Sequence, residues 1–196
     1  MRRRLVPCFI ISAATALVLA PRPARAEGYV SPFIGVNFAN NSVDRNSAKG
    51  KLNFGFDAGY MGAGVFGAEF DFGYAPDFFG ESGDFGDNHV LTAMGNLILG
   101  VPIGGTHGAG VRPYASVGVG VVRTQVTGIP GSLEVPKIDS NHWGLNAGVG
   151  MMGFFSDHAG LRGDIRYFRD LQGDIINTVD WGSFHFWRAT IGVVIR

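Results

Sequence analysis

Apolar and polar residues alternate with a period of two over most of this sequence, and that alternation restricts the fold more than any other feature. In residues 51–61, large apolar side chains occupy every second position, with asparagine, aspartate or glycine between them. Residues 66–74 repeat the pattern with phenylalanines against glycine and acidic residues. A strand whose successive side chains point to opposite faces produces this pattern. The sequence therefore predicts strands with one apolar and one polar face.

Eight alternating runs follow one another along the chain. They cover residues 29–38, 51–61, 66–74, 89–101, 111–126, 142–154, 161–168 and 184–195. The chain also contains 31 glycines, which destabilise helices. After residue 26, no stretch approaches the ~20 consecutive apolar residues of a membrane-spanning helix. We therefore predict an all-β fold of eight antiparallel strands.

The connections between these runs alternate between long and short. The long ones, rich in polar residues, glycine and proline, are residues 39–50, 75–87, 127–139 and 170–183, and the short ones are 62–64, 102–110 and 156–160. Transmembrane barrels of the bacterial outer membrane have long extracellular loops and short periplasmic turns. The alternation thus predicts an up-and-down transmembrane β-barrel with both termini in the periplasm and localisation in the outer membrane.

The large aromatic side chains indicate which face meets the lipid. An eight-stranded barrel has an interior just wide enough for side chains, and the phenylalanines of two neighbouring strands, residues 54, 56, 70 and 72, would overfill it. We expect aromatic residues to face lipid and glycines and charges to face the lumen. Tyrosine and tryptophan prefer membrane interfaces, and Tyr74, Trp143, Tyr167 and Trp187 fall at the strand ends expected near the cell surface.

Residues 1–26 have the three parts of a secretory signal peptide: three basic residues at positions 2–4, an apolar run, and Ala24 and Ala26 in A-x-A spacing. We predict cleavage before Glu27 and one barrel domain over residues 27–196. A transmembrane anchor is the alternative, but the apolar run is short and broken by Pro7 and Pro21. The only cysteine, Cys8, lies inside this segment, so we expect no disulfide, thiolate metal site or lipid anchor.

The charge balance changes when that segment is removed. The whole chain has 16 basic and 16 acidic residues, and five of its arginines belong to residues 1–26. The remaining chain is therefore acidic, which gives no electrostatic reason to expect nucleic acid as a partner.

Residues 160–170, with the sequence GLRGDIRYFRD, and residues 143–150, with the sequence WGLNAGVG, resemble the outer-membrane β-barrel domain family of small OmpA-like barrels. The resemblance extends over residues 27–196. It implies a monomeric eight-stranded barrel with a structural, adhesive or protective role in the cell envelope. The partners it implies are outer-membrane lipid and lipopolysaccharide, the barrel assembly machinery, and a surface ligand bound by the long loops.

Charged residues at lumen-facing positions are the first candidates for a functional site. Burial of a charge is costly unless it is paired, so we predict a salt-bridged plug, with Glu69 and Asp71 as a catalytic carboxylate pair or a conducting lumen as alternatives. The predicted lumen charge cluster consists of Asp57, Glu69, Asp71, Arg162, Asp164, Arg166 and Arg188.

The histidines raise the question of a metal or catalytic site. By parity His142 faces the lumen while His89 and His185 face outward, so they do not converge on one point, as metal ligands must. The pairs Ser140–His142 and Ser183–His185 have the residue types of outer-membrane lipid-modifying enzymes, but no strained nucleophile turn of the form G-x-S-x-G is present. We therefore predict no catalytic residue, metal or cofactor.

Together these patterns favour a structural or surface-interaction barrel whose lumen is plugged by paired charges. A narrow channel or a conduit for hydrophobic ligands remains the first alternative, and a lipid-modifying enzyme the second.

Overall fold

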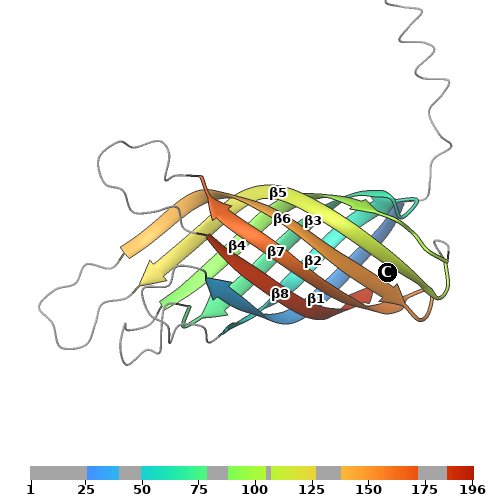
Figure 1. Ribbon diagram of the computed structural model, residues 1–196, viewed down its shortest axis with the longest axis horizontal. Helices are drawn as coiled ribbons and strands as arrows, with labels where there is room; N and C mark the ends of the chain where they lie inside the picture. The colour runs from blue at the N-terminus through green and yellow to red at the C-terminus, as the bar shows by residue number, and fades with distance from the viewer. Residues whose placement is uncertain (1–25, 40–49, 79–87, 105–106, 127–137, 172–184) are drawn as a thin grey trace, which may run out of the picture.

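The alternating runs form eight strands in the computed structural model, which describes residues 26–39, 50–78, 88–104, 107–126, 138–171 and 185–196. The strands are β1 (Ala26–Ala39), β2 (Lys51–Gly62), β3 (Phe66–Pro76), β4 (Asn88–Gly100), β5 (Gly110–Val126), β6 (Ile138–Phe154), β7 (Ala159–Asp170) and β8 (His185–Ile195). Each pairs antiparallel with the next, and β8 returns to pair with β1, which closes the barrel (Figure 1). The predicted all-β class and strand number are confirmed.

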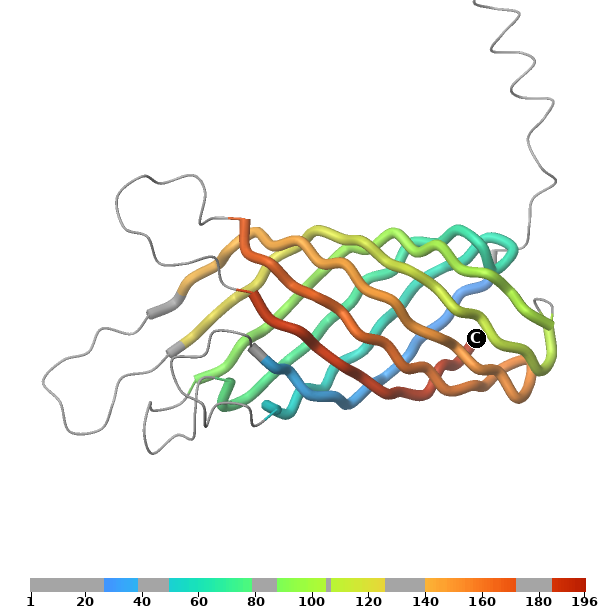
Figure 2. Tube along the Cα trace, in the orientation of Figure 1, coloured from blue at the N-terminus to red at the C-terminus, as the bar shows by residue number. Residues whose placement is uncertain are grey.

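The strands run obliquely around the barrel, as the Cα trace shows (Figure 2). No helix among the described residues is long and apolar enough to cross a membrane.

The largest difference from the predicted boundaries is in β6, which begins at Ile138 and not at residue 142. Its added residues continue the ladder with β5, where Thr124 pairs with Ser140 and Val126 with Ile138. Apolar alternation does not detect this extension because these residues are mostly polar. Most of the predicted long loops, at residues 40–49, 79–87, 127–137 and 172–184, and nearly all of the predicted signal peptide, at residues 1–25, lie outside the described residues.

A tight turn joins β2 to β3 at the end of the barrel where the first and last strands have their chain ends. The amide of Val65 donates to the carbonyl of Gly62 at 3.0 Å. Ala63 and Gly64 have φ values of 50° and 71°, the left-handed backbone that two-residue hairpins require. Ala26 is the register partner of Gly62, so β1 starts beside this turn. In an outer-membrane barrel this is the periplasmic end.

The two faces of the strands differ as predicted over most of their length. Phe54 and Phe70 are 46% and 45% exposed on the outside, whereas their neighbours Asn53 and Glu69 are 2% and 4% exposed. The rule that aromatic residues face lipid is wrong at both ends of the lumen. There, inward positions carry buried aromatic rings: Tyr29, Phe33, Tyr114, Phe154, Phe168 and Phe186.

The seam between β1 and β8 has an interrupted ladder. Val30 pairs with Ile195 and Phe33 with Gly192, but Ser31 and Pro32 between them pair only with β2. Proline has no backbone N–H to donate. The seam therefore has fewer cross-strand hydrogen bonds than its length allows.

Candidate functional site

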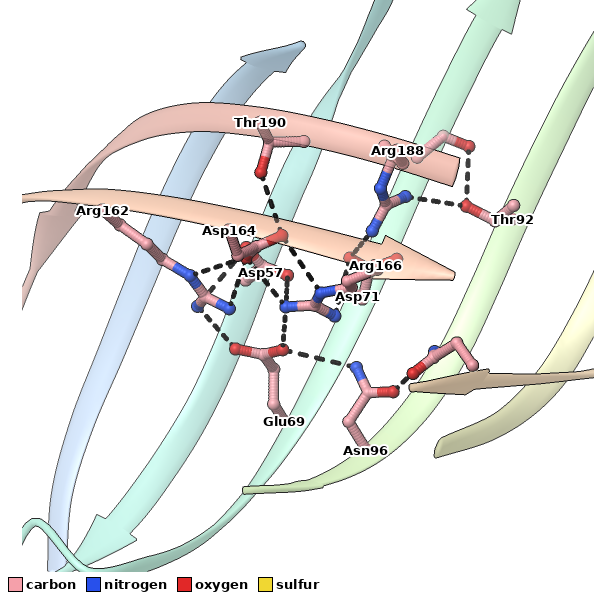
Figure 3. Close-up of polar contacts among 12 residues, drawn as sticks. Asp57, Glu69, Asp71, Thr92, Asn96, Arg162, Asp164, Arg166, Arg188 and Thr190 are labelled. Carbon is pink, nitrogen blue, oxygen red and sulfur yellow. Dashed lines mark hydrogen bonds and ion pairs between the residues drawn. The ribbon is translucent and has the colours of Figure 1, made fainter. Parts of the chain in front are cut away.

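All seven charged residues predicted to face the lumen meet in one network inside the barrel (Figure 3). They come from four strands on two opposite parts of the wall, β2 and β3 on one side and β7 and β8 on the other. None is more than 6% exposed. The alternation that places successive side chains on opposite faces puts all of them inside.

Arg166 lies at the centre of the network and contacts all four carboxylates. Its Nη1 donates to Asp71 at 3.1 Å, and its Nη2 donates to Glu69 at 2.8 Å and to Asp164 at 3.2 Å. The contact of Nη2 with Asp57 is longer, at 3.5 Å. The planar guanidinium fork suits this role because it presents several donors in fixed directions.

Arg162 occupies the periplasmic side of the network. Its Nη1 donates to Glu69 at 2.5 Å, its Nη2 donates to Asp164 at 3.2 Å, and its Nε donates to the Tyr114 hydroxyl at 2.7 Å. The Tyr29 hydroxyl donates to Glu69 at 2.6 Å. These buried phenols complete the hydrogen bonding of carboxylates that the arginines alone would leave partly unsatisfied.

Arg188 occupies the opposite side, toward the cell surface. It donates to Asp71 through Nη2 and to Thr92 through Nη1, the latter at 3.2 Å. The guanidinium lies 4.6 Å from the ring centroid of Phe168 and 5.1 Å from that of Phe33. Cation–π contacts stabilise a desolvated arginine, so aromatic rings hold Arg188 where carboxylates do not surround it.

Two lumen glycines make room for the arginines. A Cβ atom at Gly148 would lie 2.6 Å from Cγ of Arg166, and one at Gly73 would lie 2.5 Å from Nη1 of Arg188. Real Cβ atoms do not approach so closely, so any larger residue there would displace an arginine from the network.

Four carboxylates and three guanidinium groups make up the network, so the formal charges do not cancel. Asp57 has the weakest contacts, at 3.4 Å to Arg162 and 3.5 Å to Arg166, and both arginine nitrogens have closer partners. Asp57 is therefore the carboxylate that the network stabilises least as an anion.

Two apolar clusters cover the network from above and below. The periplasmic cluster comprises Tyr29, Met61, Ile98, Tyr114, Met152, Phe154 and Val194, and the cell-surface cluster comprises Ala75, Phe78, Val90, Met94, Val122, Phe168 and Phe186. Within the latter, the Phe168 and Phe186 rings stack at 4.8 Å. The sequence analysis missed both clusters, although their inward parity in the strands could have revealed them. The charges thus lie between two apolar clusters.

A second polar group lies at the periplasmic end, and the sequence analysis did not identify it. Glu27 accepts from Arg112 at 3.1 Å and pairs with Nη1 of Arg196 at 2.8 Å. Arg196 also donates from Nε to the carbonyl of Asp157 at 2.7 Å, and its guanidinium lies 3.9 Å from the Phe154 ring centroid. These contacts join β1, β5 and the end of β8.

The histidines are arranged as their parity predicted. His142 points inward, where it contacts the Ser140 hydroxyl through Nε2 and lies 3.3 Å through Nδ1 from Asp170, a neighbour the sequence analysis missed. His89 and His185 face outward beside Tyr74 and Tyr167. The Nδ1–Asp170 contact does not meet hydrogen-bond geometry in the described structure. Ser183 lies outside the described residues.

No group of three or more potential metal ligands occurs among the described residues.

The barrel is closed, has eight strands, an apolar outer surface and an ion-paired interior, and has short turns at the end where β1 begins and β8 ends. These features define a small outer-membrane β-barrel protein. The chain belongs to the outer membrane protein beta-barrel domain family, whose model matches residues 10–196. The protein is therefore located in the outer membrane. No curated protein matches the sequence.

Several solved structures share the fold. Neisserial surface protein A is 16% identical with a TM-score of 0.61, and the match covers 87% of this chain and 97% of that one. The N-terminal β-barrel domain of Pseudomonas aeruginosa OprF is 14% identical with a TM-score of 0.58, over 89% and 98% of the two chains. The attachment invasion locus protein Ail of Yersinia pestis, solved with a heparin analogue, is 15% identical with a TM-score of 0.50, over 86% and 99%.

Proposed function

We propose that this small outer-membrane barrel has a structural or surface-interaction role and that its lumen is closed to solutes. The observation that carries the proposal is the network of seven buried charges enclosed between two apolar clusters. Eight-stranded barrels have an interior that side chains fill, whereas open aqueous channels belong to barrels of roughly sixteen or more strands. A solute crossing this lumen would have to displace both clusters and break the ion pairs.

The surface-interaction part of the proposal is supported by where the strands end. The strand ends at Ala39, Pro76, Val126 and Asp170 all lie opposite the periplasmic turn, at the end of the barrel expected to face the cell surface. The fold is similar to that of Neisserial surface protein A and of the attachment protein Ail. Exposed loops on a rigid scaffold are where barrels of this size place binding residues.

Conductance of the purified, refolded protein in planar bilayers tests the closed lumen. We expect no steady conductance, while a sixteen-stranded porin inserted in the same chamber serves as the positive control. Steady openings that discriminate ions by charge would overturn the proposal.

A second candidate, a narrow channel, is favoured by one specific observation. Buried polar atoms without a hydrogen-bond partner in the described structure lie on the cell-surface side of the network, among them Oδ1 of Asn37, Oδ1 of Asn53 and Nε of Arg188. Such atoms are sites where water completes the hydrogen bonding of an interior. Ion-selective openings in the same bilayer experiment would support this candidate.

A further inference from the structure

The lumen network has a surplus of one formal negative charge. It consists of four carboxylates and three guanidinium groups, and none of these side chains belongs to a residue more than 6% exposed. An uncompensated charge is costly in a buried site, and a protein usually removes it by changing the protonation of one group or by binding a counter-ion. The network therefore requires a positive charge that its own arginines do not supply.

The surplus charge falls on Asp57, because both of its arginine contacts are shared with a closer partner. Nη1 of Arg162 lies 2.5 Å from Glu69 and 3.4 Å from Asp57. Nη2 of Arg166 lies 2.8 Å from Glu69 and 3.5 Å from Asp57. Glu69 and Asp164 each accept a tyrosine hydroxyl as well, at 2.6 Å and 2.8 Å. The other carboxylates are thus better satisfied as anions than Asp57 is.

Two buried oxygen atoms on the strands beside Asp57 have no hydrogen-bond partner in the described structure. Ser31 on β1 and Asp71 on β3 are the direct register partners of Asp57, one on each side. Both residues are fully buried, and the unpartnered atoms are Oγ of Ser31 and Oδ1 of Asp71. Directly opposite residues have Cβ atoms about 4.5–5.5 Å apart, so their polar ends can meet. An ionised carboxylate can only accept hydrogen bonds, whereas a protonated one also donates.

We propose that the lumen network is a proton-binding site, in which the carboxyl group of Asp57 takes up one proton from water as the barrel folds. The proton cancels the surplus charge and removes the repulsion between Asp57 and Asp71 across β2 and β3. It also supplies a donor beside two acceptors that lack one. A metal cation would balance the charge too, but hard cations take about six or more oxygen ligands. Arg162 and Arg166 already lie against both oxygens of Asp57, and a proton needs no further room.

The proposal couples folding of the barrel to pH. An aspartate in an unfolded chain ionises above about pH 4, so folding at higher pH consumes a proton and becomes less favourable as the pH rises. Several other charged and titratable groups face Asp57 from β1, β3, β7 and β8, and Asp57→Asn keeps all of them. They are Tyr29, Glu69, Asp71, Arg162, Asp164, Arg166 and Arg188. A comparison of wild type with Asp57→Asn therefore isolates the proton on Asp57.

Infrared spectroscopy of the refolded full barrel at pH 7 tests the proposal. A neutral carboxylic acid has a C=O stretching band at higher frequency than a carboxylate. We expect wild type to show one such band, which shifts when the barrel is refolded in D2O, and Asp57→Asn to lose it. Asp71→Asn should lose it as well, because three carboxylates then balance three guanidinium groups and Asp57 ionises. The matched control is Asp170→Asn, which removes an inward aspartate outside the network and should retain the band.

The pH dependence of folding gives a second readout. Between about pH 5 and pH 7, the folding equilibrium constant of wild type relative to Asp57→Asn is expected to fall by up to about tenfold per pH unit, the limit for one proton. The heat-dependent gel mobility of each variant verifies that the barrel is folded. Parallel pH curves, no neutral-carboxyl band in wild type, or a band that persists in Asp57→Asn would overturn the proposal. Absence of the band together with stability that rises with sodium concentration would overturn it in favour of a bound metal cation.

Discussion

Asp57 on β2 lies directly opposite Asp71 on β3, so two carboxylates of the same charge face each other across one pair of hydrogen-bonded strands. Like charges in this relation destabilise a sheet. Arg166 bridges them, at 3.1 Å from Asp71 and 3.5 Å from Asp57. Each has a second arginine, but Arg188 is in close contact with Asp71, whereas Arg162 lies 3.4 Å from Asp57. The two carboxylates are therefore unequal members of the network.

Asp57→Asn is expected to leave the free energy of unfolding unchanged or to raise it by up to about 1 kcal/mol, because it removes the like-charge pair and the surplus carboxylate. Asp164→Asn is expected to lower it by about 2–3 kcal/mol, because Asp164 accepts from Tyr114, Arg162, Arg166 and Thr190. Denaturant titration of the refolded barrel, followed by tryptophan fluorescence, measures both. Equal losses would show that Asp57 is as firmly paired as Asp164.

Arg166→Ala is expected to lower the free energy of unfolding by about 3–5 kcal/mol, since it leaves buried carboxylates without their central partner. Adding Asp164→Ala should recover part of that loss, because the two side chains are directly paired at 3.2 Å and 3.3 Å. Recovery should be incomplete, since Asp71 and Glu69 also lose a donor. As a control, Arg112→Ala, which lies outside the network, should combine additively with Asp164→Ala. Strict additivity of the Arg166 and Asp164 changes would rule out a direct pair.

The position of the barrel in the bilayer can be tested with arginine substitutions at two depths on its outer face. Ile191 is 61% exposed near the middle of β8, and Leu171 is 38% exposed just beyond the cell-surface end of β7. Ile191→Arg is expected to lower the free energy of unfolding by about 2–4 kcal/mol and Leu171→Arg by about 0–1 kcal/mol. The reason is that the penalty for arginine falls from the bilayer midplane to the interface. The comparison requires folding into lipid vesicles. The reverse order would mean that the barrel is placed at the wrong height.

The signal peptide remains a sequence prediction. Protein isolated from the envelope fraction is expected to begin at Glu27, because Ala24 and Ala26 form the A-x-A site. Intact-mass measurement of that fraction tests it, and retention of residues 1–26 would contradict it.

The sequence predicted the faces of the strands well because parity is a local property. The period-two pattern places Asp57, Glu69 and Asp71 on the lumen face, regardless of which strands are their neighbours. The partners could not be predicted this way. Tyr29 bonds to Glu69, 40 positions away, because barrel closure and tilt bring those positions together, and neither is written in a local pattern.

The apolar clusters were missed for a different reason. The expectation that aromatic residues face lipid took no account of position, although Phe168 and Phe186 have inward parity in their strands. Thr190 has inward parity in β8, but only the structure shows that its hydroxyl donates to Asp164 at 3.2 Å.

Because the ladder is interrupted at Pro32, the strand pairs of the barrel are not held together equally strongly. The other strand pairs have continuous ladders, whereas in the β1–β8 pair Ser31 and Pro32 have no partner on β8. A lateral force on the barrel, from membrane thinning or from the barrel assembly machinery, would therefore separate β1 from β8 before any other strand pair. The same seam brings together the two ends of the described chain, so the wall can be completed only after the last strand is in place.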